Sequence, residues 1–107
     1  MRFRPLLATA ALLLLGTLQA ATAQSPGAAE RGRAVAERAC AGCHAIGADQ
    51  PANAQNAGPP FRVLAARPDQ SAQRLHSLIM TPHRPMEGVP LSLAEVDDLV
   101  AFILTLR

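Results

Sequence analysis

Two cysteines and a histidine in the run "CAGCH", residues 40–44, are the side chains whose types and spacing could do chemistry. Cys40 and Cys43 are the only cysteines of the chain, and His44 follows directly. A disulfide between the two thiols would close a very small loop, so it would remove little entropy from the unfolded chain. A thioredoxin-like redox pair requires a preceding strand within a βαβ unit, and no such pattern precedes the motif.

Metal or cofactor binding explains the motif better. A structural zinc site would need a second pair of ligands, and His76 and His83 do not fit any zinc-finger spacing. The remaining interpretation is covalent haem attachment, for which C-x-x-C-H is the known pattern. Cys40 and Cys43 at a helix end would then form thioethers with two vinyl groups on one porphyrin edge. His44 would lie beneath the iron as its proximal ligand.

Three helices separated by two irregular stretches would have to position this motif. The first helix is expected over about residues 26–40, with Ser25 as its N-cap. The second is expected over about residues 69–80, and the third begins after Ser92, where "SLAE" forms a capping box. No segment shows the alternation of a strand, so we expect an all-α fold. Two Pro-, Gly- and Asn-containing stretches are expected to be loops: residues 47–60 and 81–90.

Two of these helices carry a periodic apolar face that predicts the core. The face of the second helix consists of Ala72, Leu75, Leu78 and Ile79. The face of the third helix consists of Val96, Leu99, Val100, Ile103 and Leu106, with Leu93 and Phe102 at its edges. We expect both faces to be buried.

The first 23 residues have the features of a secretory signal peptide. Two arginines precede an apolar run over residues 6–18, and "ATA" at residues 21–23 is a small-x-small cleavage pattern. The apolar run is shorter than the roughly 20 residues needed to span a bilayer. We therefore expect cleavage after residue 23, a periplasmic domain over residues 24–107, and no stable membrane span.

The composition of residues 24–107 limits what this domain could bind. Eight arginines balance eight acidic residues, and lysine is absent from the chain. The formal charge is therefore zero, which gives no support to nucleic-acid binding. A domain this short buries a thin core and often depends on a staple or cofactor. Phe61 and Phe102 are its only aromatic residues, so we expect a bound group to fill its centre.

These features together resemble the class I c-type cytochromes, which are small monohaem electron carriers, over essentially all of residues 24–107. Gly32 lies eight residues before the first cysteine, where the family uses glycine to let the first and last helices touch. Phe102 matches the aromatic residue that packs across this glycine. The resemblance implies three main helices wrapped around one covalently attached haem c, with the N- and C-terminal helices packed together.

Two further segments resemble the ligand-bearing parts of that family. "GPPF", residues 58–61, is similar to its Gly-Pro turn, which implies that the carbonyl of Pro59 accepts a hydrogen bond from Nδ1–H of His44. "HRPMEG", residues 83–88, looks like the loop that carries the distal methionine, which implies that Met86 is the sixth ligand of the iron. A thioether ligand raises the haem potential and suits an electron carrier.

Other candidate ligands have plainer explanations. Met80 falls near the apolar stripe of the second helix and is expected to be a core residue. His83, which would give a bis-histidine haem, is expected to face solvent in its loop, and His76 is assigned no role. Three arginines could form bidentate hydrogen bonds to the haem propionates, and the sequence favours none of them: Arg62, Arg67 and Arg84.

The predicted function is one-electron transfer between redox proteins by a monomer or small subunit, without enzyme activity of its own. The tryptophan often found near a haem propionate in relatives is absent, and so are their docking lysines. Docking is therefore expected on an apolar rim with weak salt dependence. The alternative is a haem subunit or dedicated electron acceptor of a periplasmic dehydrogenase. A haem-based sensor ranks behind both, because Met86 would fill the site that a sensor leaves open.

Overall fold

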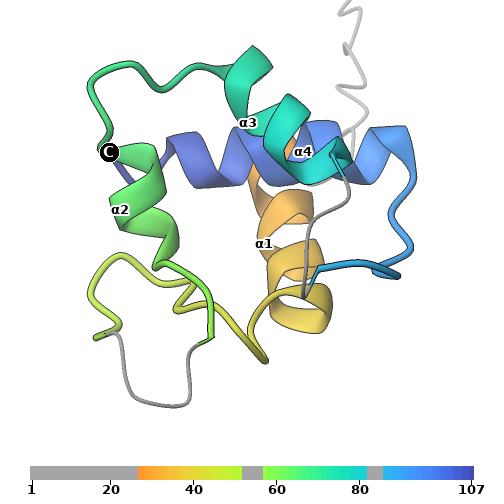
Figure 1. Ribbon diagram of the computed structural model, residues 1–107, viewed down its shortest axis with the longest axis horizontal. Coiled ribbons are helices and arrows are strands. Elements are labelled where there is room, and N and C mark those ends of the chain that lie inside the picture. The colour runs from red at the N-terminus through yellow and green to blue at the C-terminus, as the bar shows by residue number, and fades with distance from the viewer. Residues whose placement is uncertain (1–26, 52–56, 82–85) are drawn as a thin grey trace, which may run out of the picture.

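The computed structural model of the protein describes residues 27–51, 57–81 and 86–107. Within these ranges the chain forms helices and no strand, which confirms the all-α prediction (Figure 1). The signal peptide expected over residues 1–23 lies outside the described residues. Among the residues that are described, no helix is both long and apolar enough to cross a membrane. The helices are α1 (Ala28–Ala39), α2 (Phe61–Ala65), α3 (Ala72–Met80) and α4 (Leu93–Leu104).

Hydrogen bonds at the N-cap residues determine where the longer helices α1 and α4 begin. The Ser92 hydroxyl accepts a hydrogen bond from the Glu95 N–H at 3.3 Å, and the Glu95 carboxylate accepts one from the Ser92 N–H at 2.8 Å. This confirms the predicted capping box of α4. The N-cap of α1 is Gly27, whose N–H donates to the Glu30 carboxylate at 3.0 Å. The expected N-cap at Ser25 was therefore wrong, because this glycine–carboxylate contact starts the helix two residues later.

The short helix α2 was missed by the sequence, and α3 begins later than predicted. A five-residue helix is too short to show a helical period, and α2 instead begins where the Pro60 carbonyl accepts from the Val63 and Leu64 N–H groups. Before α3, the Gln70 N–H donates to the Arg67 carbonyl at 3.0 Å and closes a turn. Ser71 is the N-cap of the helix, and its hydroxyl accepts a hydrogen bond from the Arg74 N–H.

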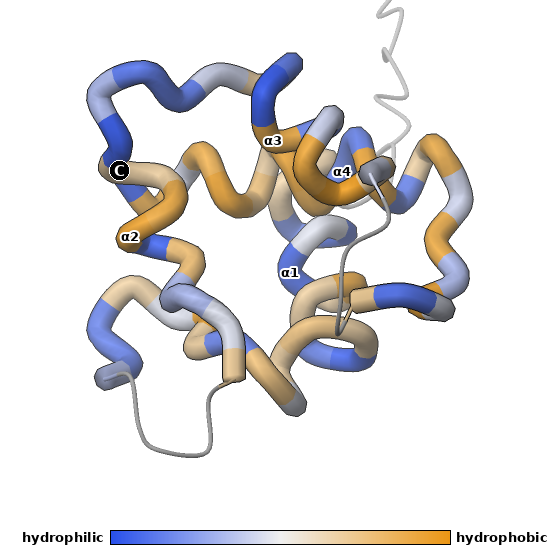
Figure 2. The backbone as a smooth tube through the Cα atoms, in the orientation of Figure 1, coloured by the Kyte–Doolittle hydropathy of each residue, from blue (hydrophilic) through white to orange (hydrophobic). Residues whose placement is uncertain are grey.

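Helix α4 forms the centre of the fold and contacts the other three helices. Apolar residues follow one another along the second half of α4 (Figure 2). Helix α1 crosses it (Figure 1), and Gly32 sets how closely the two approach. A Cβ atom at Gly32 would lie 1.9 Å from the Asp98 carbonyl oxygen and 2.8 Å from Cβ of Phe102. The expected packing of the N- and C-terminal helices is therefore confirmed.

The predicted apolar face of α4 is buried almost as expected. Val96, Leu99, Val100 and Ile103 are buried, and Phe102 belongs to the core rather than to its edge. The face predicted for α3 was largely wrong: Leu75 is buried, Ile79 is half-buried, and Leu78 and Ala72 are exposed. The reason is that α3 packs into the core through Leu75, with Ile79 beside it, which leaves Ala72 and Leu78 in solvent.

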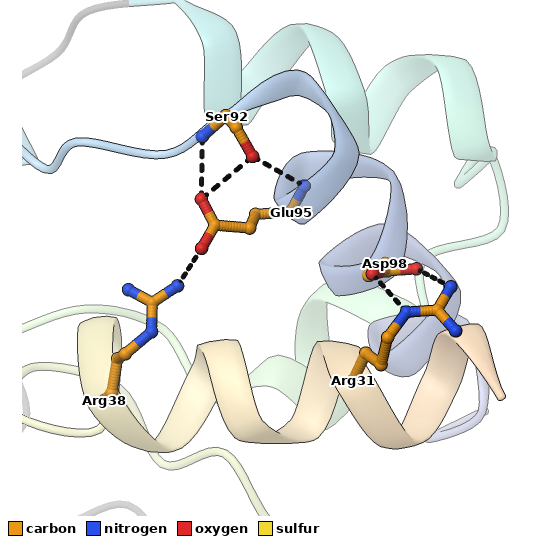
Figure 3. A network of polar contacts seen from close by, with 5 residues as sticks. All are labelled: Arg31, Arg38, Ser92, Glu95 and Asp98. Carbon is orange, nitrogen blue, oxygen red and sulfur yellow. Dashed lines mark hydrogen bonds and ion pairs between the residues drawn. The ribbon is translucent and has the colours of Figure 1, made fainter. Parts of the chain in front are cut away.

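Two ion pairs join α1 to α4 (Figure 3). Arg31 donates to both carboxylate oxygens of Asp98, at 2.8 and 2.7 Å, and Arg38 pairs with Glu95. The hydrogen bond from Arg31 holds the pKa of Asp98 below its ordinary value. The backbone N–H of Ser92 is the main cause of the lowered pKa of Glu95. Both carboxylates therefore stay ionised while they tie the two helices together.

Candidate haem site

A cavity of about 400 Å³ lies between the end of α1, the segment before α2, the end of α3 and the stretch that leads into α4. Its volume falls within the range of small-molecule and cofactor sites, roughly 300–1,000 Å³. The structure brings every site residue that we predicted from the sequence to the wall of this cavity: Cys40, Cys43, His44, Pro59 and Met86.

The two cysteines reach the cavity because α1 ends in a tight turn. Cys40 caps the helix, its N–H donating to the Ala36 carbonyl, and its own carbonyl accepts from the N–H groups of Cys43 and His44 at 3.0 and 2.9 Å. Within the described part of the chain, no disulfide joins Cys40 to Cys43. Burial raises the pKa of the Cys40 thiol, and the nearby Arg38 guanidinium offsets part of this rise.

The imidazole of His44 is buried and held by the segment that precedes α2. Two backbone hydrogen bonds of 2.9 Å join the segments, from the Gly58 N–H to the Cys43 carbonyl and from the Phe61 N–H to the Ala45 carbonyl. Nδ1 of His44 lies 2.8 Å from the carbonyl oxygen of Pro59. A carbonyl oxygen only accepts, so the proton belongs on Nδ1 and the lone pair of Nε2 is left for a metal.

Gly58 and Phe61 also hold the His44 ring in place, and the sequence analysis did not predict this role for either of them. A Cβ atom at Gly58 would lie 2.2 to 2.7 Å from three ring atoms of His44, so the imidazole packs directly on the glycine backbone. The Phe61 ring is tilted by 44° against the imidazole, with their centroids 5.2 Å apart. Both residues stand in the "GPPF" stretch, which was the available signal, but their contacts depend on how two distant segments pair.

Met86 reaches the cavity from a turn rather than from a helix. The Val89 N–H donates to the Met86 carbonyl at 3.4 Å, and Gly88 has the positive φ of +89° that favours glycine in such a turn. Met80, the last residue of α3, lines the same cavity and is 45% exposed. The expectation that Met80 is a core residue was therefore wrong, because it stands at the end of α3 and borders the cavity, outside the buried core cluster.

The other candidates lie elsewhere. Nε2 of His76 lies 3.5 Å from a carboxylate oxygen of Asp97, on the part of α3 that faces α4. Arg62 and Arg67 are exposed and do not belong to the cavity wall as far as the structure describes it. His83 and Arg84 lie outside the described residues.

The wall of the cavity fits a covalently attached haem. It offers two thiols for the thioether bonds, one imidazole nitrogen whose lone pair is free to bind iron, and thioether sulfur as a second iron ligand. Apolar side chains complete the wall, as a porphyrin face requires: Ala39, Ile79, Leu91, Val96 and Leu99. Elsewhere in the described residues, no cluster of three His, Cys, Asp or Glu side chains is placed to hold a metal.

The family model for cytochrome c matches residues 29–107. The chain belongs to the cytochrome c family. It is 35% identical over 95 residues to cytochrome c-552 of Bradyrhizobium diazoefficiens, an alignment that covers 89% of this chain and 90% of that protein. No solved structure matches the chain. Membership shows that this cytochrome carries one covalently bound haem c and that it is an electron carrier.

Proposed function

We propose that this protein is a periplasmic monohaem cytochrome that passes single electrons between redox proteins. Cys40 and Cys43 bind the haem as thioethers, and His44 and Met86 are the axial ligands of its iron. The observation that carries the proposal is the setting of His44: its Nδ1 is hydrogen-bonded to Pro59, within the cavity that both cysteines and Met86 line. The haem, when bound, supplies the Fe(II)/Fe(III) chemistry.

The two axial ligands act on the potential in opposite directions. The Pro59 carbonyl accepts a hydrogen bond from Nδ1–H of His44, which makes the imidazole a better electron donor and favours ferric iron. The thioether of Met86 is a soft ligand and favours ferrous iron. Because backbone hydrogen bonds hold both residues, neither ligand has to move when one electron is gained or lost. This keeps the reorganisation on electron transfer small.

The apolar wall supplies the second influence on the potential. Val96 and Leu99 of α4 are 0% and 2% exposed and form the floor of the cavity. Such a wall excludes water and disfavours the oxidised haem, which carries the greater charge. We expect electrons to enter and leave at the haem edge beside the two cysteines, of which Cys43 is exposed. Met86 at the sixth position argues against a sensor, which needs that position vacant.

The spectrum of the ferric protein tests this proposal. We expect the weak near-infrared band of a thioether–iron bond, and we expect the ferrous protein not to bind carbon monoxide, because both axial positions are filled. Slow, incomplete reduction together with ready carbon monoxide binding would contradict the carrier and favour a ligand-binding protein. A single low-spin species that lacks the band would instead point to histidine as the sixth ligand.

A further inference from the structure

A single carboxylate connects the end of α1 to the start of α4. Oε2 of Glu95 accepts hydrogen bonds from the backbone N–H and the hydroxyl of Ser92, at 2.8 and 3.0 Å. Oε1 of Glu95 pairs with the guanidinium of Arg38, which lies in the last turn of α1 (Figure 3). These three residues form the Arg38–Glu95–Ser92 network, in which both oxygens of one carboxylate are engaged.

The two ends of the network adjoin segments that line the haem cavity. Arg38 lies two residues before Cys40, whose carbonyl accepts a hydrogen bond from the His44 N–H at 2.9 Å. Ser92 follows directly after residues 86–91, most of which line the cavity. The network therefore joins the two segments that carry the proposed axial ligands, although these segments are far apart in the sequence.

The other ion pair between the same two helices has a different setting. Arg31 lies near the beginning of α1, at the end of the helix remote from Cys40, and its partner Asp98 lies further along α4 than Glu95. The side chains of Arg31 and Arg38 are 48% and 52% exposed, so solvent screens both pairs. Both pairs can stabilise the helix contact, but the Arg38 pair alone adjoins the haem-binding motif.

We propose that Glu95 is a positioning residue for the two axial ligands. Through Arg38 and Ser92, it holds the end of α1 and residues 86–91 at a fixed separation. The inference rests on the proposed function, because it takes His44 and Met86 as the ligands of the iron. The network acts without transfer of a proton or an electron, by limiting how far the two ligand-bearing segments can separate.

Imidazole binding to the ferric, haem-loaded protein tests this proposal. Imidazole must displace the Met86 thioether, so its apparent affinity rises with the fraction of molecules in which the two segments have separated. We expect this affinity to be about threefold higher in Arg38→Gln and in Glu95→Gln than in wild type. The Glu95→Gln variant keeps an acceptor for the Ser92 N–H, and with it the capping box, so α4 should still begin at the same residue.

Arg31→Gln is the matched control, because it breaks the other ion pair between the same helices. We expect its urea midpoint to fall about as much as that of Arg38→Gln, while its imidazole affinity stays within about 1.5-fold of wild type. Arg38→Lys, which keeps the charge, should recover most of the wild-type resistance to imidazole. Equal increases of affinity in Arg31→Gln and Arg38→Gln would overturn the proposal, because they would show a general loosening of the helix contact.

The double variant Arg38→Gln/Glu95→Gln separates positioning from charge. The two substitutions remove charges of opposite sign, so an electrostatic effect on the iron would change imidazole affinity in opposite directions. Positioning predicts increases in the same direction, and a double variant that binds imidazole no more tightly than either single variant. Opposite or additive changes, with the thioether band present in the wild-type spectrum, would overturn this inference alone. Absence of that band from wild type would contradict the proposed function, and this inference with it.

Discussion

At the scale of single residues, the structure explains how one imidazole is held in a fixed orientation. His44 packs on the backbone of Gly58, hydrogen-bonds to Pro59 and lies against Phe61. The resemblance to a family pointed to Pro59 through the "GPPF" turn. It did not reveal the glycine contact, which exists only because residues 58–61 pair with residues 43–45 across the chain. Local sequence carries no record of that pairing.

Gly58→Ala should therefore disturb His44, the proposed haem ligand, more than the addition of one methyl group suggests. The added Cβ would overlap three atoms of the His44 ring, so either the ring or the turn must shift. Overpacking of this kind costs about 1–3 kcal/mol of unfolding free energy. We expect that loss in urea unfolding of the holoprotein, together with altered g-values in the electron paramagnetic resonance spectrum of the ferric haem.

Gly42→Ala is the matched control within the haem-binding motif. No atom of the described chain lies within 4 Å of a Cβ at Gly42, so the substitution should leave both the stability and the g-values close to wild type. Equal effects of the two substitutions would contradict the contact between Gly58 and His44 as the cause.

At the scale of elements, the crossing of α1 and α4 governs the fold because it fixes where the motif leaves α1. This crossing could be predicted, because Gly32 and Phe102 stand at positions that the family uses for it. Helix α2 could not be predicted, because five residues are too few to show a helical period. The exposure of Leu78 and Met80 could not be predicted either, because it depends on which residues of α3 pack into the core.

Gly32→Ala should destabilise the protein although alanine favours helices. In an open helix this change stabilises by about 1 kcal/mol. Here the new Cβ would lie 1.9 Å from the Asp98 carbonyl oxygen, a backbone atom that cannot turn away. We expect the free energy of unfolding to fall by about 1–3 kcal/mol in urea titration.

Gly27→Ser provides the comparison for this prediction. The position has open space around it and is the N-cap of α1, where serine is favoured. We expect unchanged or slightly increased stability. A stabilised Gly32→Ala variant would show that the two helices do not approach as closely as the structure has them.

Acid should weaken the contact between α1 and α4. The pKa values of Asp98 and Glu95 lie below their ordinary values of 3.8 and 4.5 in the folded protein. The unfolded chain therefore binds protons more readily, and the stabilisation present at neutral pH is lost as the pH falls through that range. We expect the urea concentration at the unfolding midpoint to decrease as the pH is lowered from about 5 to 3.

Asp98→Asn tests whether the Asp98 carboxylate is responsible for the loss of stability in acid. The variant should be less stable than wild type at neutral pH, because Arg31 loses its charged partner, and its midpoint should depend less steeply on acid pH. An unchanged slope would assign the acid sensitivity to other groups.

At the scale of the whole molecule, the charge balance bears on how the protein meets its partners. Residues 24–107 carry equal numbers of arginines and acidic residues, and the chain has no lysine. The described rim of the cavity includes the apolar side chains of Met80 and Val89, both partly exposed. Long-range electrostatic steering therefore has little to act on, and short-range apolar contact is left to position a partner.

Electron transfer to or from a partner protein should consequently respond weakly to salt. We expect the bimolecular rate constant, followed by stopped-flow absorbance, to change less than about threefold between roughly 10 and 200 mM ionic strength. A fall of an order of magnitude or more would show that a charged surface directs docking.

The mass of the mature protein under denaturing conditions tests the proposed covalent attachment of haem most directly. We expect a polypeptide of residues 24–107 plus one haem that survives denaturation. We also expect no thiol that reacts with an alkylating reagent, because the proposed thioethers would occupy both Cys40 and Cys43. A haem-free mass with two alkylated cysteines would contradict covalent attachment.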